Sequence, residues 1–178
     1  MLLNKIPVLD KGYIALISSM NDSKRLKEVG LEFFGTEAIN QKTLSLGQAT
    51  MVFKCPIFVH VFLSQFGFTI VTTKQVEELE AYCPSPGEIG CPEHETNRLV
   101  SDDIERTTAA LLINPKAYQA DGCDRFISQL IMPVSTYTTI LVSGGYEQWV
   151  RFCKQANLPA PIESYRLATT QIMNTEWK

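Results

Sequence analysis

The chain has 178 residues, of which 45% are hydrophobic and 20% are charged, and its formal net charge is −3. This size and composition are typical of a globular protein with a real core, and we expect residues 1–178 to form a single domain. The acidic balance argues against strong binding to nucleic acid through phosphate neutralisation. The longest apolar run is far shorter than a membrane span, and the first residues do not resemble a signal peptide.

The first half of the chain carries several strand signals. Residues 8–13 and 14–17 predict two strands around an Asp-Lys-Gly turn, and residues 21–29 predict a helix capped by Asn21-Asp22-Ser23 and closed by Gly30. Residues 49–54 predict a further strand. Residues 56–66 predict a helix that begins at Pro56 and stops at Gly67, and residues 68–73 have the β-branched composition of a strand.

The second half is richer in helix signals. Residues 83–95 hold several prolines and glycines and predict a loop. A helix is predicted from Ser101 to about Ile113, where Pro115 limits it or starts another. Residues 123–132 predict a helix, residues 133–142 a strand broken by Gly144-Gly145, and residues 146–157 and 162–173 two final helices. The fold class is therefore predicted as α+β, with a small mixed or antiparallel sheet and several helices.

The chain holds five scattered cysteines, at positions 55, 83, 91, 123 and 153. This odd count predicts free thiols in a reduced, cytoplasmic setting. Cys83, Cys91 and His94 could supply three zinc ligands from one loop. Their spacing is not that of a zinc finger, so a surface loop with incidental thiols is the preferred interpretation.

Other polar groups allow a functional and a structural interpretation. Carboxylates cluster at Glu77, Glu78 and Glu80 and again at 102–105, where they could seat a metal, although charged helix starts explain them more simply. His60 lies on an apolar helix and is interpreted as a packed or interface residue. Ser143-Gly144-Gly145 could turn around a phosphate at a helix start, but one glycine pair is a weak signal. Three cations on the last two helices form a basic face or a solvated surface: Arg151, Lys154 and Arg166.

Four segments of the chain resemble flavin-dependent thymidylate synthases. Residues 122–138, GCDRFISQLIMPVSTYT, are similar to the family block Gly-x-x-x-Glu-x-Ala-Arg-x-x-Leu-Pro-x-x-x-Tyr-Thr. Arg151-Phe152-Cys153 resembles the family's Asn-Phe-Leu or His-Phe-Leu helix, and residues 160–168 resemble its Ala-Gln-x-Glu-Ile-Arg segment. Lys54-Cys55-Pro56-Ile57-Phe58-Val59 resembles its Lys-Ala-Pro-Ile-Phe-Val. The resemblance covers nearly the whole chain, in order.

The charged residues of that family are absent from the matching positions. The signature Arg-His-Arg falls on Gln65-Phe66-Gly67, the Glu-x-Ala-Arg motif on residues 126–129, and a further arginine on Glu147. Each charge-assisted contact to a phosphate contributes about 1.5–3 kcal/mol. Losing four or more of them would remove most of a micromolar affinity, about 8 kcal/mol. The chain thus matches the family at residues that pack the fold and differs from it at the charged residues that bind the ligands.

The resemblance implies a homotetramer and, if the family activity is retained, binding of FAD and dUMP. Because the cations are missing, we predict a non-catalytic homologue without a cofactor, with a structural, regulatory or partner-binding role. An inactive subunit beside an active relative is a related alternative. The other alternative is an enzyme that methylates or hydroxymethylates dUMP, with flavin or folate, in a rearranged site using Arg125, Arg151 and Arg166. No catalytic residue or metal ligand is assigned. The candidate substrate-binding residues are Arg151, Arg166, Ser143 and Gly144.

Overall fold

A computed structural model describes residues 4–20, 47–72, 79–89, 91–122 and 132–176 of the chain. The chain forms two compact units, one from residues 1–55, 59–75 and 138–178, and the other from residues 56–58 and 76–137. The expectation of one domain over residues 1–178 stays a prediction. No helix among the described residues combines the length and the apolar character needed to cross a membrane.

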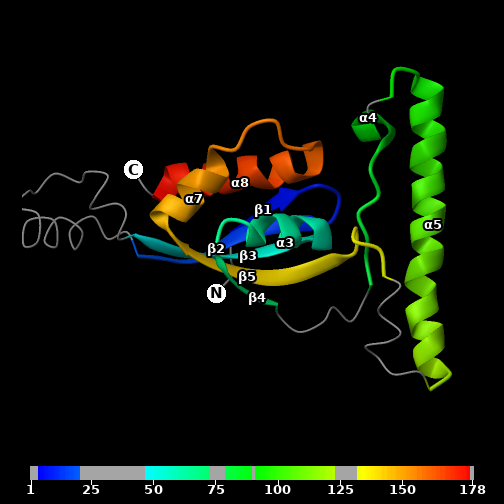
Figure 1. Cartoon of the computed structure of the whole chain (residues 1–178), viewed down its shortest axis with the longest axis horizontal. Coiled ribbons are helices and arrows are strands. Elements are labelled where there is room, and N and C mark those ends of the chain that lie inside the picture. The colour runs from blue at the N-terminus through cyan, green and yellow to red at the C-terminus, as the bar shows by residue number, and fades with distance from the viewer. Residues whose placement is uncertain (1–3, 21–46, 73–78, 90, 123–131, 177–178) are drawn as a thin grey trace, which may run out of the picture. The chain divides into compact units, whose positions relative to one another are not determined.

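Five strands form one sheet in the order β1-β2-β3-β5-β4 (Figure 1). Their bounds are Lys5–Val8 for β1, Gly12–Met20 for β2, Gln48–Pro56 for β3, Thr69–Thr72 for β4 and Tyr137–Gly145 for β5. The pairs β1–β2, β2–β3 and β4–β5 are antiparallel. The predicted α+β class and the small antiparallel sheet are therefore confirmed.

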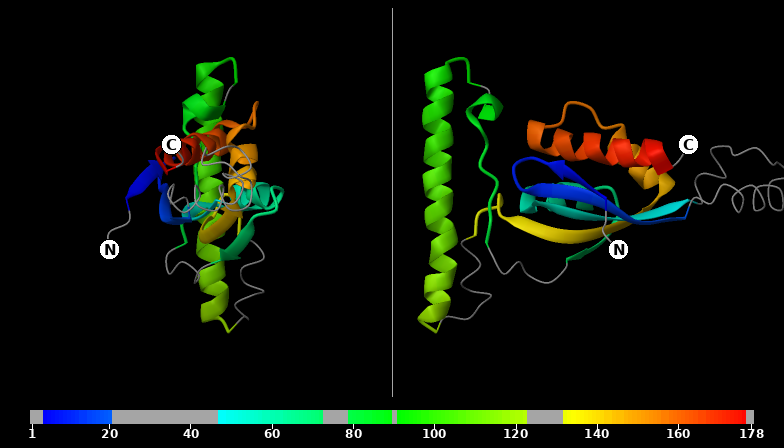
Figure 2. Two further views of the ribbon diagram at one scale, coloured as in Figure 1. Left: turned by 90° about the vertical axis from the view of Figure 1, so that its left-hand side faces the viewer. Right: turned by 180° about the vertical axis from the view of Figure 1, so that it is seen from behind.

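The described helices are α3 (Ile57–Ser64), α4 (Pro86–Ile89), α5 (His94–Ala120), α7 (Tyr146–Cys153) and α8 (Ala160–Glu176). In the first unit α7 and α8 run along the sheet, as two opposite views show (Figures 1 and 2). The predicted helices over residues 21–29 and 123–131 lie outside the described residues.

The core of the first unit lies between the sheet and these two helices. Phe53 of β3 stacks on Trp149 of α7 and on Tyr165 of α8, with ring centroids 6.2 and 6.3 Å apart. All three side chains are fully buried. Along β3 the buried positions include Ala49, Met51, Phe53 and Cys55, the two-residue period of a strand with one face covered. Strand β3 thus determines which face of the sheet receives the helices.

Helix α3 starts one residue later than predicted. Pro56 is the last residue of β3, and the helix begins at Ile57. The N–H groups of Ile57 and Phe58 donate to the carbonyl oxygens of Thr136 and Val134, at 3.0 and 3.1 Å. These backbone acceptors bind two of the N–H groups that the first turn leaves without a helical partner. Because both acceptors are distant in sequence, they give no local signal for the start of the helix.

The second unit corrects two further predictions. Residues 83–95, predicted as a loop, contain α4, and α5 begins at His94 rather than Ser101. The Ser101 hydroxyl donates to the Pro84 carbonyl at 2.6 Å instead of capping a helix. Pro115 lies inside α5, which continues to Ala120. The missing N–H of Pro115 therefore removes one helical bond without ending the helix.

The other boundaries shift by a few residues. Strand β5 covers residues 137–145 rather than 133–142. Gly144 and Gly145 are therefore the last two residues of the strand, whereas the sequence predicted that they lie beyond its end. Helix α7 ends at Cys153, before the predicted limit of 157, and α8 covers 160–176 rather than 162–173. Strand β3 and the turn of the first hairpin are confirmed close to their predicted places, but β1 covers residues 5–8 rather than 8–13 and β2 covers 12–20 rather than 14–17.

Candidate functional site

Ser143 lies on the half-exposed face of the sheet. Its hydroxyl oxygen accepts hydrogen bonds from Thr50 Oγ1 at 3.0 Å and Gln48 Nε2 at 3.3 Å. Its neighbours in β5, Val142 and Gly144, are buried. Successive side chains of a strand point to opposite faces, so Ser143 faces away from the covered side of the sheet. The structure does not bring Ser143 together with the side chains of α7.

Gly144 is required by packing. A Cβ atom at this position would meet Cδ1 of Phe68 at 2.4 Å and Cε1 at 2.7 Å. The Phe68 ring itself packs on Trp149, with centroids 4.3 Å apart, and Trp149 Nε1 donates to the Gly144 carbonyl at 3.0 Å. The absence of a side chain at Gly144 therefore lets the aromatic core close against β5.

The first N–H groups of α7 have protein acceptors. The Gly145 N–H donates to Oε1 of Gln148, and the Tyr146 N–H donates to the Gly47 carbonyl, both at 2.8 Å. A helix start can bind an anion through such groups, but here these two are engaged within the protein. The predicted phosphate-binding role of Ser143 and Gly144 thus gains no geometric support from this turn.

Arg166 connects α8 to the end of α7. Its Nε donates to Glu163 at 2.7 Å, a second N–H also reaches that carboxylate, and Nη1 donates to the Cys153 carbonyl at 2.7 Å. The Glu163 bonds raise the pKa of Arg166, and Arg166 in turn holds the pKa of Glu163 below its usual value. Carbonyls at a helix end favour a cation. The charge of Arg166 is therefore largely compensated inside the protein.

Arg151 is placed differently. Its Nη2 donates to the carbonyl oxygen of Phe66 at 2.8 Å, and Phe66 lies two residues after the end of α3. A neutral carbonyl does not itself compensate the guanidinium charge, and the group has several further N–H donors. The ion pairs found among the described residues belong to Arg98, Arg106 and Arg166. Of the two predicted arginines in the described region, Arg151 is the one suited to an external anion.

Two hollows flank the outer side of α7. One, of about 540 Å³, is lined among the described residues by Tyr146, Glu147, Gln148, Val150, Arg151, Lys154 and Gln155. The other, of about 290 Å³, lies between α7 and α8 and is lined by Tyr146, Val150, Cys153, Lys154, Thr170, Met173 and Asn174. Tyr146, Val150 and Lys154 line both, at the four-residue spacing that places side chains on one helix face. We call these three residues together with Arg151 the α7 surface.

Cys153 lies in the smaller hollow. Burial raises the pKa of its thiol, although a hydrogen bond with Thr170 and the charge of Arg166 act in the opposite direction. A thiol with a raised pKa is a poor nucleophile, because the thiolate is the reactive form. Burial also raises the pKa of Cys55, more strongly. Neither thiol fits a catalytic role.

Phe66 is buried in a cluster of aromatic rings. Its ring centroid lies 5.5 Å from those of Phe62 and Phe152 and 6.1 Å from that of Phe68. Gln65 and Gly67 beside it carry no charge, and the Gly67 carbonyl accepts a bond from Gln148. A flavin diphosphate needs cationic or multiple N–H donors. The described residues of this segment therefore do not fit a flavin.

Two metal sites were considered in the sequence and not assigned, and Glu77 and Glu78 of one of them lie outside the described residues. No group of three or more His, Cys, Asp or Glu residues in the described part of the chain is arranged to hold a metal ion. Cys83 and Cys91 are of intermediate exposure. In the same region the Glu88 carboxylate accepts bonds from Tyr82 and Ser85. Burial would raise its pKa, but these bonds outweigh burial and lower it.

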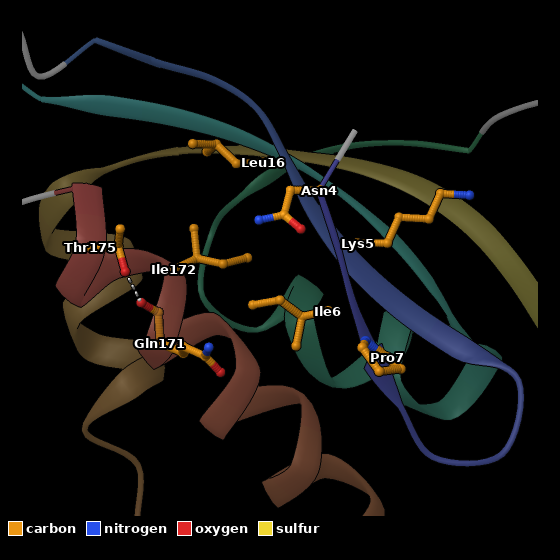
Figure 3. Close-up of a pocket in the computed structure, with 8 residues that line it drawn as sticks. All are labelled: Asn4, Lys5, Ile6, Pro7, Leu16, Gln171, Ile172 and Thr175. Carbon is orange, nitrogen blue, oxygen red and sulfur yellow. Dashed lines mark hydrogen bonds between the residues drawn. The ribbon is translucent and has the colours of Figure 1, made fainter. Parts of the chain in front are cut away.

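A third hollow, of about 460 Å³, lies between the first hairpin and α8 (Figure 3). Its cation, Lys5, is drawn extending away from the helix wall, and its Nζ lies 4.2 Å from the Tyr13 ring centroid. The Gln171 carbonyl accepts a bond from Thr175 within the helix. Apart from Lys5, which is engaged with Tyr13, the described lining of this pocket consists of amide, hydroxyl and aliphatic groups, so it is a weaker candidate for an anionic ligand.

The sequence did not point to Tyr146 or Gln148 as site residues. The available signal was the four-residue spacing of Tyr146, Val150 and Lys154 in the predicted helix over residues 146–157. Arg125 and Phe126, also considered in the sequence, lie outside the described residues. The candidate site therefore consists of the α7 surface, of which the sequence predicted Arg151.

Comparisons with known proteins give a fold but no family. No protein-family model matches the sequence, and no match is found among curated proteins. Among solved structures, the chain is similar to the UMP/dUMP methylase PolB from Streptomyces cacaoi, determined with 5-Br dUMP bound. The TM-score is 0.71 at 15% identity, and the match covers 96% of this chain and 91% of that one. The two proteins share a fold over nearly their whole lengths.

Proposed function

We propose that this protein is an enzyme that binds a pyrimidine nucleotide of the UMP or dUMP class and modifies its base. The observation that supports this most is the fold likeness to a UMP/dUMP methylase over 96% of the chain. The charge of Arg151 on the α7 surface is consistent with an anionic ligand. Methylation or hydroxymethylation of the base, with a folate one-carbon donor, is the reaction class proposed.

In this proposal the site differs from that of flavin-dependent thymidylate synthases. The segment at the position of their Arg-His-Arg signature, Gln65-Phe66-Gly67, presents a buried phenyl ring, Phe66, and no cation. We therefore assign no step to a flavin at this segment. What the chain itself contributes is a cation held in place by the Phe66 carbonyl, and a half-buried aromatic ring, Tyr146, five residues before it.

A second candidate is a non-catalytic homologue with a structural, regulatory or partner-binding role, as a homo-oligomer or with another protein. The observation that favours it is the same burial of Phe66, since a filled pocket serves packing rather than chemistry. Both candidates use the same fold, and they differ in whether a pyrimidine nucleotide binds and reacts.

Calorimetric titration of the purified chain with UMP, dUMP and AMP separates the candidates. The enzyme proposal expects dUMP or UMP to bind at least tenfold more tightly than AMP. It also expects tritium release from dUMP labelled at C5 when methylenetetrahydrofolate is present, because substitution at C5 must displace that hydrogen. Binding without release, with or without added FAD and NADPH, would favour the non-catalytic role. Absence of any pyrimidine-nucleotide binding would overturn the enzyme proposal.

A further inference from the structure

We infer that the α7 surface binds the phosphate of a nucleotide between Arg151 and Lys154, with the base or sugar against Tyr146; this rests on the proposed function for the identity of the ligand. The larger hollow holds both cations and one acidic side chain, Glu147. A nucleoside monophosphate carries up to two negative charges near neutral pH. The surface therefore offers a net positive charge to a dianion.

Arg151 is held in position for this role. Its Nη2 lies 2.8 Å from the Phe66 carbonyl oxygen, and this hydrogen bond holds one edge of the planar guanidinium in place. Gln148, one turn earlier, donates to the next carbonyl, that of Gly67. Both side chains thus attach α7 to the end of α3. An arginine held in this way loses less side-chain entropy when it binds a phosphate through its remaining donors.

Lys154 and Tyr146 complete the surface by their spacing. Lys154 follows Arg151 by three residues, and at this spacing helical side chains are neighbours. Tyr146 begins α7, is half-buried and lines the larger hollow together with Arg151 and Lys154. Tyr146 and Lys154 both line the two hollows. A ligand with an anionic group for Arg151 and Lys154 and a flat ring for Tyr146 matches this surface.

Arg166 is excluded from this role by its contacts. The bidentate bond to Glu163 and the bond to the Cys153 carbonyl engage its guanidinium. The two arginines predicted together from the sequence therefore have different roles, Arg151 toward a ligand and Arg166 toward the helix pair. Replacement of Arg166 should therefore lower the free energy of unfolding and leave the preference for a phosphate-bearing ligand unchanged.

The test compares UMP with uridine, which lacks the phosphate. For the wild type we expect UMP to bind at least tenfold more tightly than uridine, and less tightly as NaCl is raised, since exposed charges are screened. Arg151→Ala should weaken UMP binding about 10- to 100-fold, the value of a charge-assisted bond. In the Arg151→Ala, Lys154→Ala double variant the UMP-to-uridine ratio should approach one. An unchanged ratio would overturn the inference.

Two variants protect the test against loss of folding. Lys154 is exposed and follows α7, so Lys154→Ala should leave stability unchanged and still weaken UMP binding. Arg151→Lys keeps the positive charge, so its ratio of UMP affinity to uridine affinity should lie between those of the wild type and Arg151→Ala. Lys11→Ala in the first hairpin and Arg98→Ala in α5 serve as charge controls that line neither hollow. If these controls weaken UMP binding as much, the effect is general electrostatics and the inference fails.

Failure of the inference and failure of the proposed function give different results. If the wild type binds UMP and the α7 variants bind it equally well, the function stands and the inference fails. If the wild type binds no nucleotide, NMR titration with inorganic phosphate decides the anion site. A shift of the Arg151 Nε–H signal would keep the anion site without the function, and no shift would reject both.

Discussion

Gly12 offers a direct test of how the first hairpin packs on α8. A Cβ atom at Gly12 would lie 2.0 Å from the Tyr165 hydroxyl oxygen, 2.7 Å from the Val8 carbonyl and 2.8 Å from the Lys54 carbonyl. Tyr165 is fully buried, and its hydroxyl donates to the Lys54 carbonyl at 2.7 Å. An added methyl group must therefore displace a buried hydrogen bond and push on backbone.

The expected cost of Gly12→Ala follows from these two effects. Overpacking a tight site costs about 1–3 kcal/mol, and disrupting a buried hydrogen bond costs about 1–3 kcal/mol. We expect the free energy of unfolding to fall by about 2–5 kcal/mol, a large share of a typical total of about 5–15 kcal/mol. In a Tyr165→Phe background the hydroxyl is gone, so the same substitution should cost at least about 1 kcal/mol less.

Urea unfolding followed by tryptophan fluorescence measures this cost. A Trp177→Phe background leaves the buried Trp149 as the reporter of the first unit. Gly87→Ala is the matched control, because a Cβ at Gly87 meets nothing within 4 Å and lies in helix α4. A change below about 0.5 kcal/mol for Gly12→Ala, within the range of ordinary surface substitutions, would refute the reasoning, as would an equal cost with and without the Tyr165 hydroxyl.

Three further predictions concern the core, pH and thiols. Phe66→Ala should lower the free energy of unfolding by about 3–5 kcal/mol, as for other buried aromatic residues, measured by urea unfolding. Arg166 holds the pKa of Glu163 below its usual value, so the ionised carboxylate stabilises the fold at neutral pH. That stability should be lost as pH falls through the lowered pKa, and Glu163→Gln should abolish this part of the pH dependence of unfolding. Iodoacetamide at neutral pH should label Cys83 well before the buried Cys55, by peptide mass spectrometry.

Each of these has a control within the chain. Val61, which lies in α3 five residues before Phe66 and is 57% exposed, should tolerate Val61→Ala with a change below about 0.5 kcal/mol. Arg166→Ala should remove the same pH-dependent contribution as Glu163→Gln, because the pair acts together; retention of it would mean that another group lowers the Glu163 pKa. In urea, Cys55 should react as fast as Cys83. Equal rates in the folded protein would contradict its burial.

The sequence determined the elements whose signals are local. The hairpin around Gly12, strand β3 and the last two helices follow from alternation, turn residues and helical spacing, and these lie near their predicted places. The α+β class follows from their order. Helix α5 was predicted in part, because its start is set by residues that the sequence showed only as a loop, and because Pro115 is accommodated inside it.

Only the tertiary structure decided the roles of several polar residues. Arg151 and Arg166 look alike in sequence, but Arg151 donates to the neutral carbonyl of Phe66, 85 residues away, and Arg166 donates to the Glu163 carboxylate, three residues before it in α8. Ser143 and Gly144 are neighbours whose side-chain positions face opposite sides of the sheet. A side chain's charge is fixed by its covalent structure. The Glu163–Arg166 pair has the three-residue spacing of helical neighbours and can be inferred from the sequence, whereas the contact of Arg151 with the distant Phe66 carbonyl forms only when the chain folds.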